Sequence, residues 1–316
     1  MTTIATEEYV EDFPDVRPSY DIDDTTTAAS MLGDYAVKRL REIADTADGP
    51  LTLMVSGGID SLHMLAAAVR AGIDANAVCV AYLPHPGSMA QARTMHLAAR
   101  NLGFTGDVDV LLLDEVPHIS QRVDGLVDVL DTDDVWEVGA GLIFHVVDQH
   151  TGRNATLVSA SGADTLLCGG VDFGLATGSV GAWDELRQGT INAAFTRSRR
   201  IPDFYDRVMD SGSKRHYKLW QTHEAMALTN RLHPTAVRGA QWATDKAALR
   251  LSGLMLGLDF DDVTAAKEPM QSSSGATQLI ADIAAGREIG PDEPLSDSPD
   301  YVEVAAGLYL AQLAGN

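Results

Sequence analysis

The chain has 316 residues, of which 45% are hydrophobic and 22% charged, and its formal net charge is −22. This length suffices for one large core or two small ones, and the strong acidity argues against binding to a nucleic-acid backbone over a broad surface. The two cysteines, Cys79 and Cys168, are too few for a four-cysteine zinc site or a disulfide framework, and no apolar run has the length of a membrane span. We therefore expect a cytoplasmic protein with no membrane contact.

The N-terminal part of the chain predicts an arm followed by a helix. Residues 1–25 are rich in aspartate and glutamate without periodicity, which is typical of a flexible acidic arm. Residues 26–47 place Leu32, Ala36 and Leu40 on one face, as in an amphipathic helix. We expect one domain over residues 26–285, followed by a loop and a short helix over residues 286–316.

The most informative stretch is L-T-L-M-V-S-G-G-I-D-S, residues 51–61. Residues 51–55 form an apolar run that predicts a buried strand, and an amphipathic helix is expected from Asp60 until Gly72. The two glycines between them allow a tight turn whose N–H groups approach an anion. A strand, a glycine loop and a helix start in this order form a binding site for phosphate.

The rest of the chain alternates between strands and helices and then becomes helical. Further strands are predicted at residues 77–83, 108–113 and 155–159. Helices are predicted from Ser88, as N-cap, to residue 102 and at residues 118–130 and 133–149, and no clear strand follows residue 184. The alternation predicts an α/β fold with a parallel sheet, flanking helices and a helical C-terminal half, with ligands at the carboxyl ends of the strands.

The glycine loop resembles the pyrophosphate loop of the N-type ATP pyrophosphatases, which include asparagine synthetase, β-lactam synthetase and GMP synthetase. It has neither the G-x-x-x-x-G-K-[ST] nor the G-x-G-x-x-G spacing of other phosphate loops. The resemblance implies an adenine nucleotide α-hydrolase-like fold and cleavage of ATP between its α- and β-phosphates. The residues that it implies for ATP binding are Ser56, Gly57, Gly58, Asp60 and Ser61 in the loop, with Ala81 and Leu83 near the adenine.

A second motif, S-A-S-G-A-D-T-L-L-C-G-G at residues 159–170, resembles the asparagine synthetase segment S-G-E-G-S-D-E-L-F-G-G-Y. The resemblance implies that Asp164 and Asp60 hold Mg²⁺ on the pyrophosphate and that Gly162 belongs to the nucleotide site. The sequence departs from the pattern at Ser161, where the family has glutamate, and at Thr165. Serine alone is no general base near neutral pH, so the departure concerns the second half-reaction and not ATP binding.

Three later segments follow the order of asparagine synthetase. N-R-L-H-P at residues 230–234 and K-A-A-L-R at residues 246–250 resemble its E-V-R-V-P and K-x-x-L-R segments. A-K-E-P-M-Q-S-S-S-G at residues 266–275 resembles its K-E-x-F segment, which makes Lys267 the main candidate for charge stabilisation. A further set of basic residues is either a solvated face or a patch for anions: Arg197, Arg199, Arg200, Lys214, Arg215 and Lys218.

Together these resemblances imply an AMP-forming ligase similar to asparagine synthetase, which uses ATP and Mg²⁺, with Lys267, Asp60 and Asp164 as catalytic residues. It would adenylate a carboxylate or carbonyl of a small-molecule substrate for attack by ammonia or an amine. Residue 2 is Thr, not the cysteine of glutamine-dependent members, so ammonia is expected from a separate glutaminase or another source. A catalytically impaired nucleotide-binding subunit and a nucleobase-modifying pyrophosphatase remain alternatives, and a homo-oligomer remains open.

Overall fold

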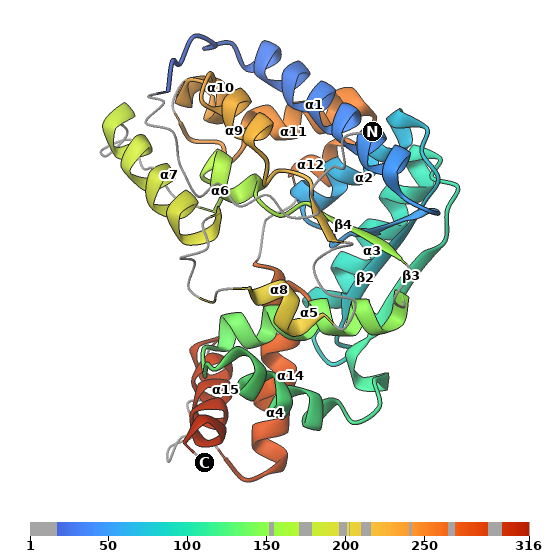
Figure 1. Ribbon diagram of the computed structural model, residues 1–316, viewed down its shortest axis with the longest axis vertical. Coiled ribbons are helices and arrows are strands. Elements are labelled where there is room, and N and C mark those ends of the chain that lie inside the picture. The colour runs from blue at the N-terminus through green and yellow to red at the C-terminus, as the bar shows by residue number, and fades with distance from the viewer. Residues whose placement is uncertain are drawn as a thin grey trace.

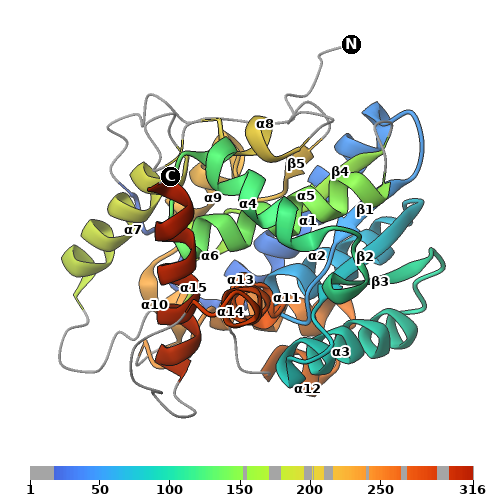
Figure 2. The same cartoon turned by 90° about the horizontal axis from the view of Figure 1, so that it is seen from below.

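The protein is described by a computed structural model that covers residues 18–151, 155–170, 179–195, 201, 203–209, 216–239, 242–264, 269–289 and 299–315. Its centre is a five-stranded sheet in the order β3-β2-β1-β4-β5, of which Figure 1 labels β2, β3 and β4, and Figure 2 labels every strand. Every pair of neighbouring strands is parallel. The strands are β1 (Leu51–Met54), β2 (Ala75–Ala81), β3 (Val108–Leu112), β4 (Thr156–Ser159) and β5 (His216–Lys218).

The order of the strands reverses at the centre of the sheet. From β1, the chain moves outward through β2 to β3, and it then returns to the other side of β1 to form β4 and β5. Loops that leave neighbouring strands on the two sides of such a switch point diverge, and they open a crevice at the carboxyl ends of the strands. The loops after β1 and β4 are therefore the ones that border this crevice.

Each predicted strand is present within about two residues of its expected bounds, and the α/β prediction is confirmed at this level. The expectation of no strand after residue 184 is wrong, because β5 pairs with β4 from Leu157 to Ser159. Its three residues, H-Y-K, contain no apolar run that the sequence could reveal. The pairing with β4, and not the propensity of the segment, defines this edge strand.

Helices cover both faces of the sheet (Figures 1 and 2). Alternate strand residues point to opposite sides, so Leu53 and Cys79 belong to one core while Val78 and Leu157 belong to the other. The helices of the described residues, in chain order, are α1 (Thr25–Thr46), α2 (Ile59–Ala71), α3 (Pro86–Leu102), α4 (Ile119–Leu130), α5 (Val135–Thr151), α6 (Ala163–Leu167), α7 (Val180–Phe195), α8 (Phe204–Val208), α9 (His223–Thr229), α10 (Pro234–Arg238), α11 (Ala247–Leu256), α12 (Phe260–Thr264), α13 (Met270–Ser273), α14 (Ala276–Gly286) and α15 (Pro299–Ala314), with a short 3-10 turn η1 (Leu113–Glu115).

The two cores are formed by different helices. The first core packs α1, α2, α3 and α11 against the sheet, and the second packs α4, α5, α14 and α15. Figure 2 shows α14 and α15 side by side and α7 on the opposite side of the molecule from α3. No helix among the described residues is both long and apolar enough to cross a bilayer.

Both ends of the described chain are packed. The backbone N–H of Ser19 donates to Asn230 at 3.0 Å, and Ile22 forms a β-bridge with Leu232, so the predicted arm is wrong for residues 18–25. Residues 1–17 lie outside the described residues. In α15, Tyr309 and Leu310 are fully buried in the second core, so the boundary predicted at residue 286 does not separate this helix from the domain.

The start of α3 differs from its prediction. Its N-cap is His85 and not Ser88. The Ser88 hydroxyl is buried and donates to the carbonyl of Tyr82 at 2.7 Å, while Pro86 takes the first helical position. Because proline is favoured at the first helical position, Pro86 makes the residue before it the cap.

The buried histidine of α2 makes the stability of the fold sensitive to acid. His63 is fully buried, its Nε2 lies 2.9 Å from the Ser252 hydroxyl, and burial lowers its pKa to about 4. Because this pKa is below the ordinary value of about 6.5, the unfolded chain binds the proton more readily. The contribution to stability is complete above pH 6.5 and is lost as the pH falls towards 4.

We expect the free energy of unfolding to fall by about 3 kcal/mol from this group alone between pH 7 and pH 4. A His63→Gln variant should show a shallower decrease, as measured by denaturant unfolding at several pH values. His150, an exposed partner of Asp109, provides the matched control variant His150→Gln. Equal slopes for wild type and His63→Gln would contradict the prediction.

Candidate active site

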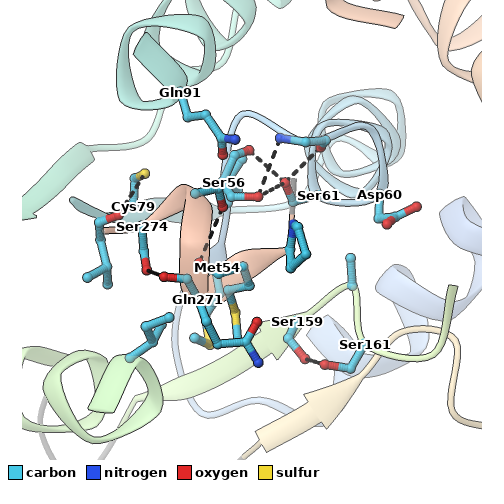
Figure 3. A pocket seen from close by; sticks show the side chains of 18 of the residues that line it. Met54, Ser56, Asp60, Ser61, Cys79, Gln91, Ser159, Ser161, Gln271 and Ser274 are labelled. Atoms are coloured by element: carbon cyan, nitrogen blue, oxygen red, sulfur yellow. Dashed lines mark hydrogen bonds between the residues drawn. The ribbon is translucent and has the colours of Figure 1, made fainter. Parts of the chain in front are cut away.

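The glycine loop lies at the carboxyl end of β1, and the hydroxyl of Ser61 organises it (Figure 3). This oxygen lies 2.7 Å from the carbonyl of Ser56 and 2.9 Å from the carbonyl of Gly58. At Gly57, a Cβ atom would lie only 2.8 Å from the carbonyl oxygen of Gln91. The close approach of α3 to the loop therefore requires glycine at this position, which sequence alone did not show.

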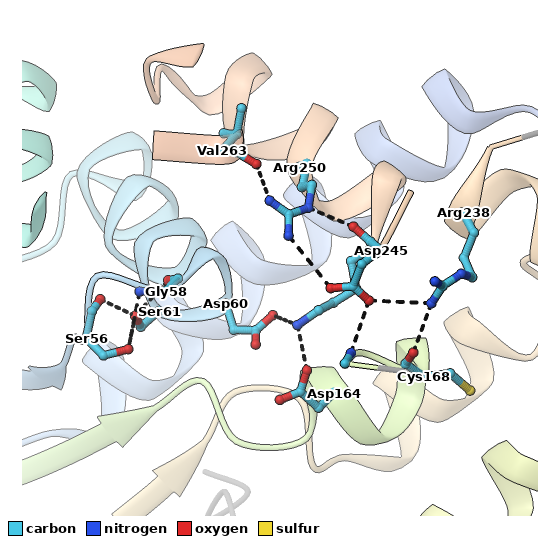
Figure 4. A network of polar contacts seen from close by, with 12 residues as sticks. Ser56, Gly58, Asp60, Ser61, Asp164, Cys168, Arg238, Asp245, Arg250 and Val263 are labelled. Carbon is cyan, nitrogen blue, oxygen red and sulfur yellow. Dashed lines mark hydrogen bonds and ion pairs between the residues drawn. The ribbon is translucent and has the colours of Figure 1, made fainter. Parts of the chain in front are cut away.

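Two carboxylates and one ammonium group meet beside this loop (Figure 4). Asp60 lies in the first turn of α2, Asp164 in the first turn of α6, and Lys246 directly before α11. The Nζ atom of Lys246 lies 2.5 Å from Asp60 Oδ1 and 2.6 Å from Asp164 Oδ1. The lysine is fully buried, and a buried ammonium is tolerated only when it is paired in this way.

The backbone around this cluster has no room for a further atom. A Cβ at Gly169 would lie 2.1 Å from Asp164 Oδ1 and 2.6 Å from Lys246 Cε. Lys246 itself has a positive φ of 50°, which is unfavourable for a residue other than glycine. Strain of this kind persists only where the surroundings hold it, and it is common at functional sites.

A second set of ion pairs holds Lys246 in place. The carboxylate of Asp245 accepts from Arg238 Nη1 at 3.4 Å and from the N–H of Gly170 at 3.1 Å. Arg250 Nε donates to the carbonyl of Asp245 at 2.7 Å. These contacts connect the residue before Lys246 both to the turn after α6 and to α11, so they fix the ammonium between the two aspartates.

The loop and the two aspartates line one end of a pocket of about 440 Å³. This polar end contains Ser56, Gly58, Ser61 and the two carboxylates. Other walls are mainly apolar and come from β2, from α5, and from α13 with its two cap residues: Val78, Cys79, Val80, Trp136, Ile143, Phe144, Val147, Pro269, Met270, Gln271, Ser273 and Ser274. The loop can donate to an anionic group whose charge a cation on the two carboxylates offsets, and the apolar walls suit a planar apolar ring.

Several predicted site residues lie together in this pocket: Ser56, Gly58, Asp60, Ser61 and Asp164. The adenine contacts predicted at Ala81 and Leu83 stay a prediction, and neither residue lines the large pocket. Ala81 is buried in the first core and Leu83 is 55% exposed at the surface, while residues 78–80 of β2 line the pocket. The part of β2 that lines the pocket therefore precedes the strand end that the sequence indicated.

The other predicted residues are not among those that line the large pocket. Gly162 has a φ of 100° and lines a smaller neighbouring pocket, not the larger one. Lys267 lies outside the described residues, although Ser273 and Ser274 of the same segment line the large pocket. Among the six basic residues, only Lys218 is described, and it is 2% exposed with its Nζ 4.0 Å from the ring centroid of Tyr205. Lys218 is therefore not part of a solvated face.

Sequence reasoning did not single out Lys246 as a functional residue. The signal lies in K-A-A-L-R, which resembles the K-x-x-L-R segment of asparagine synthetase. No described group of three or more histidine, cysteine, aspartate or glutamate side chains is arranged to hold a metal ion. Asp60 and Asp164 are two carboxylates that line the pocket. Further ligands of a metal ion bound there would come from a bound molecule or water.

Comparison with known proteins adds no family assignment. No model of a known protein family matches the chain, and no characterised protein matches its sequence significantly.

Proposed function

We propose that the protein is an ATP-dependent ligase that releases AMP and pyrophosphate. It would adenylate a carboxylate or carbonyl oxygen of a small substrate, which ammonia or an amine then attacks. The observation that carries the proposal is the meeting of the S-G-G-I-D-S loop and Asp164 in one pocket, with the buried Lys246 paired to both Asp60 and Asp164. An anion-binding loop at the switch point of a parallel sheet also supports the finer assignment to an adenine nucleotide α-hydrolase-like fold.

Asp60 and Asp164 suit Mg²⁺, because this ion prefers oxygen ligands and commonly takes one or two carboxylates together with substrate phosphates and water. When bound, Mg²⁺ would neutralise charge on the pyrophosphate. The N–H groups of residues 57–59 would bind phosphate oxygens at the start of α2. Lys246 would supply a fixed positive charge where negative charge develops on the leaving group.

The substrate oxygen attacks the α-phosphorus, and the bond to the oxygen that bridges the α- and β-phosphates breaks. Positioning of the reacting groups accounts for most of the acceleration in this kind of step. Lys267 remains a prediction as a second charge-stabilising residue, as does a separate glutaminase or other ammonia source. Both belong to the proposal and concern the same reaction.

The thiols of the protein argue against one alternative, sulfur transfer to a nucleobase. Burial raises the pKa of Cys168 to about 12 and that of Cys79 to about 12 as well. A thiol acts as a nucleophile through its thiolate, which is scarce at neutral pH for both residues. Cys168 packs in the first core and is not poised for chemistry.

We expect purified protein with ATP, Mg²⁺ and a productive acceptor to form AMP and pyrophosphate. Anion-exchange chromatography of the nucleotide products checks this directly. ADP and phosphate as products would contradict the proposal. Tight ATP binding without any AMP, across a broad panel of acceptors, would instead support the alternative of a catalytically impaired nucleotide-binding subunit.

A further inference from the structure

A smaller pocket of about 180 Å³ adjoins the large one. Ser161 lines both pockets, so its side chain lies where they meet. The smaller pocket is also lined by Gly162 and Thr165 of the second motif, by Glu137 of α5, and by Gln221, which follows β5. Its size suits a small metabolite, since pockets for drug-sized ligands are larger.

Gln221 presents an unpaired donor in this pocket. Its side chain is 4% exposed, and its Nε2 atom has no hydrogen-bond partner within the described part of the chain. Buried polar groups are normally paired, so a buried amide N–H at a pocket wall indicates an acceptor on a bound molecule. The neighbouring backbone fixes this donor: Trp220 N–H donates to the Ser161 carbonyl at 3.2 Å, and a Cβ at Gly162 would lie 2.9 Å from the backbone nitrogen of Gln221.

Ser161 presents a second donor through a chain of hydrogen bonds, of which Figure 3 shows the link between Ser159 and Ser161. Its hydroxyl lies 2.9 Å from that of Ser159, which lies 2.8 Å from Nε2 of the fully buried His216. Burial, and then the charge of Lys218, hold the pKa of His216 well below its usual range, so the imidazole is neutral. Its Nδ1 has no partner among the described residues.

A hydrogen on Nδ1 of His216 would be a buried donor without an acceptor, so we assign the hydrogen to Nε2. The bonds then run from His216 to Ser159 and from Ser159 to Ser161. Each hydroxyl accepts one bond and donates the next. The hydroxyl hydrogen of Ser161 is left to donate into the pockets.

We propose that the smaller pocket binds the molecule that is adenylated, a small carboxylate, and that Gln221 and Ser161 donate to its carboxylate oxygens; this rests on the proposed function. An ionised carboxylate accepts hydrogen bonds without donating, so it matches two donors. Its oxygen forms the bond to the α-phosphorus of ATP, and pyrophosphate leaves with the electron pair of the broken P–O bond. No proton has to be removed in this step.

The related motif has glutamate where this chain has Ser161. Serine presents a neutral donor at this position, whereas an ionised glutamate only accepts hydrogen bonds.

Binding of small acids tests the subsite. The probes are the standard amino acids together with lactate, malate and glycerate, each with and without Mg-ATP, and the readout is the shift in Tm followed by calorimetric Kd. We expect at least one probe to bind the wild type and to bind Gln221→Leu and Ser161→Ala about tenfold to a hundredfold more weakly. Gln188→Leu, at an exposed glutamine of α7, should keep the wild-type affinity.

Two results would overturn the proposal: no probe binds the wild type, or both variants bind as tightly as the wild type. If Gln221→Leu does not fold, Ser161→Ala decides alone, because its hydroxyl is only half-buried. The binding measurements with and without Mg-ATP distinguish a failure of this inference from a failure of the proposed function. ATP binding without acid binding refutes only the subsite, whereas acid binding that depends on Gln221 without ATP binding supports the carboxylate site and refutes the proposed function.

Discussion

A Lys246→Met variant is expected to release pyrophosphate from ATP about a hundredfold more slowly than the wild type. Methionine retains much of the apolar stem but removes the ammonium that lies 2.5 Å from Asp60 and 2.6 Å from Asp164. Loss of one preorganised charged donor typically costs on the order of 3 kcal/mol in the transition state. A coupled assay of pyrophosphate, with a productive acceptor, measures the change.

The same variant is expected to bind Mn²⁺ more tightly in the absence of nucleotide. In the wild type, a cation that binds between Asp60 and Asp164 competes with Lys246. In the variant, these two carboxylates lack the positive charge of the lysine. Electron paramagnetic resonance of free and bound Mn²⁺ measures this affinity without any turnover. Lys38→Met, at an exposed lysine paired with Glu224, should change neither quantity. Wild-type values for Lys246→Met in both assays would remove this lysine from the chemistry of the site.

A Gly169→Ala variant is expected to lose Mg-ATP affinity by at least about tenfold and to unfold more easily by about 1–3 kcal/mol. The added methyl group would lie 2.1 Å from Asp164 Oδ1 and 2.6 Å from Lys246 Cε, far inside contact distance. Either the aspartate or the lysine has to move, and the arrangement of charges is lost. Calorimetric titration and denaturant unfolding measure the two effects.

Gly189→Ala in α7 is the matched control, because a Cβ there would have no neighbour within 4 Å. Alanine favours a helix interior over glycine, so this variant should be as stable as the wild type or more stable by up to about 1 kcal/mol. If Gly169→Ala binds Mg-ATP like the wild type, the tight contact at Asp164 is not required. The role assigned to that contact would then be wrong.

The centre of the sheet was predictable because its signals are local. The apolar run of β1 ends in two glycines, and α2 and α3 end at Gly72 and Gly103, which adopt the left-handed conformation expected of such C-caps. β5 was not predictable, because its three residues become a strand only by pairing with β4. Its position matters for the site, since Gln221 follows it.

The candidate site was predictable only in part, for a related reason. Asp60 and Asp164 both follow strands of a parallel sheet, so their nearness follows from topology. Lys246 follows no strand, and it reaches the aspartates because α11 packs against α1 and α2. No local pattern encodes such helix packing. The sequence also did not show that residues 78–80 of β2 line the pocket, because the position of the apolar wall depends on α5 and α13.

The cluster of Asp60, Asp164 and Lys246 joins segments that lie far apart in the sequence. Lys246 is 186 residues from Asp60 and 82 residues from Asp164. Contacts of such separation form late and slow folding, so partly folded chains lack the cluster. A nucleotide that binds it binds the native state alone, and at a hundredfold excess over Kd it adds about 2.7 kcal/mol to stability. The concentration of ATP would then affect the rate of proteolytic degradation as well as the rate of turnover.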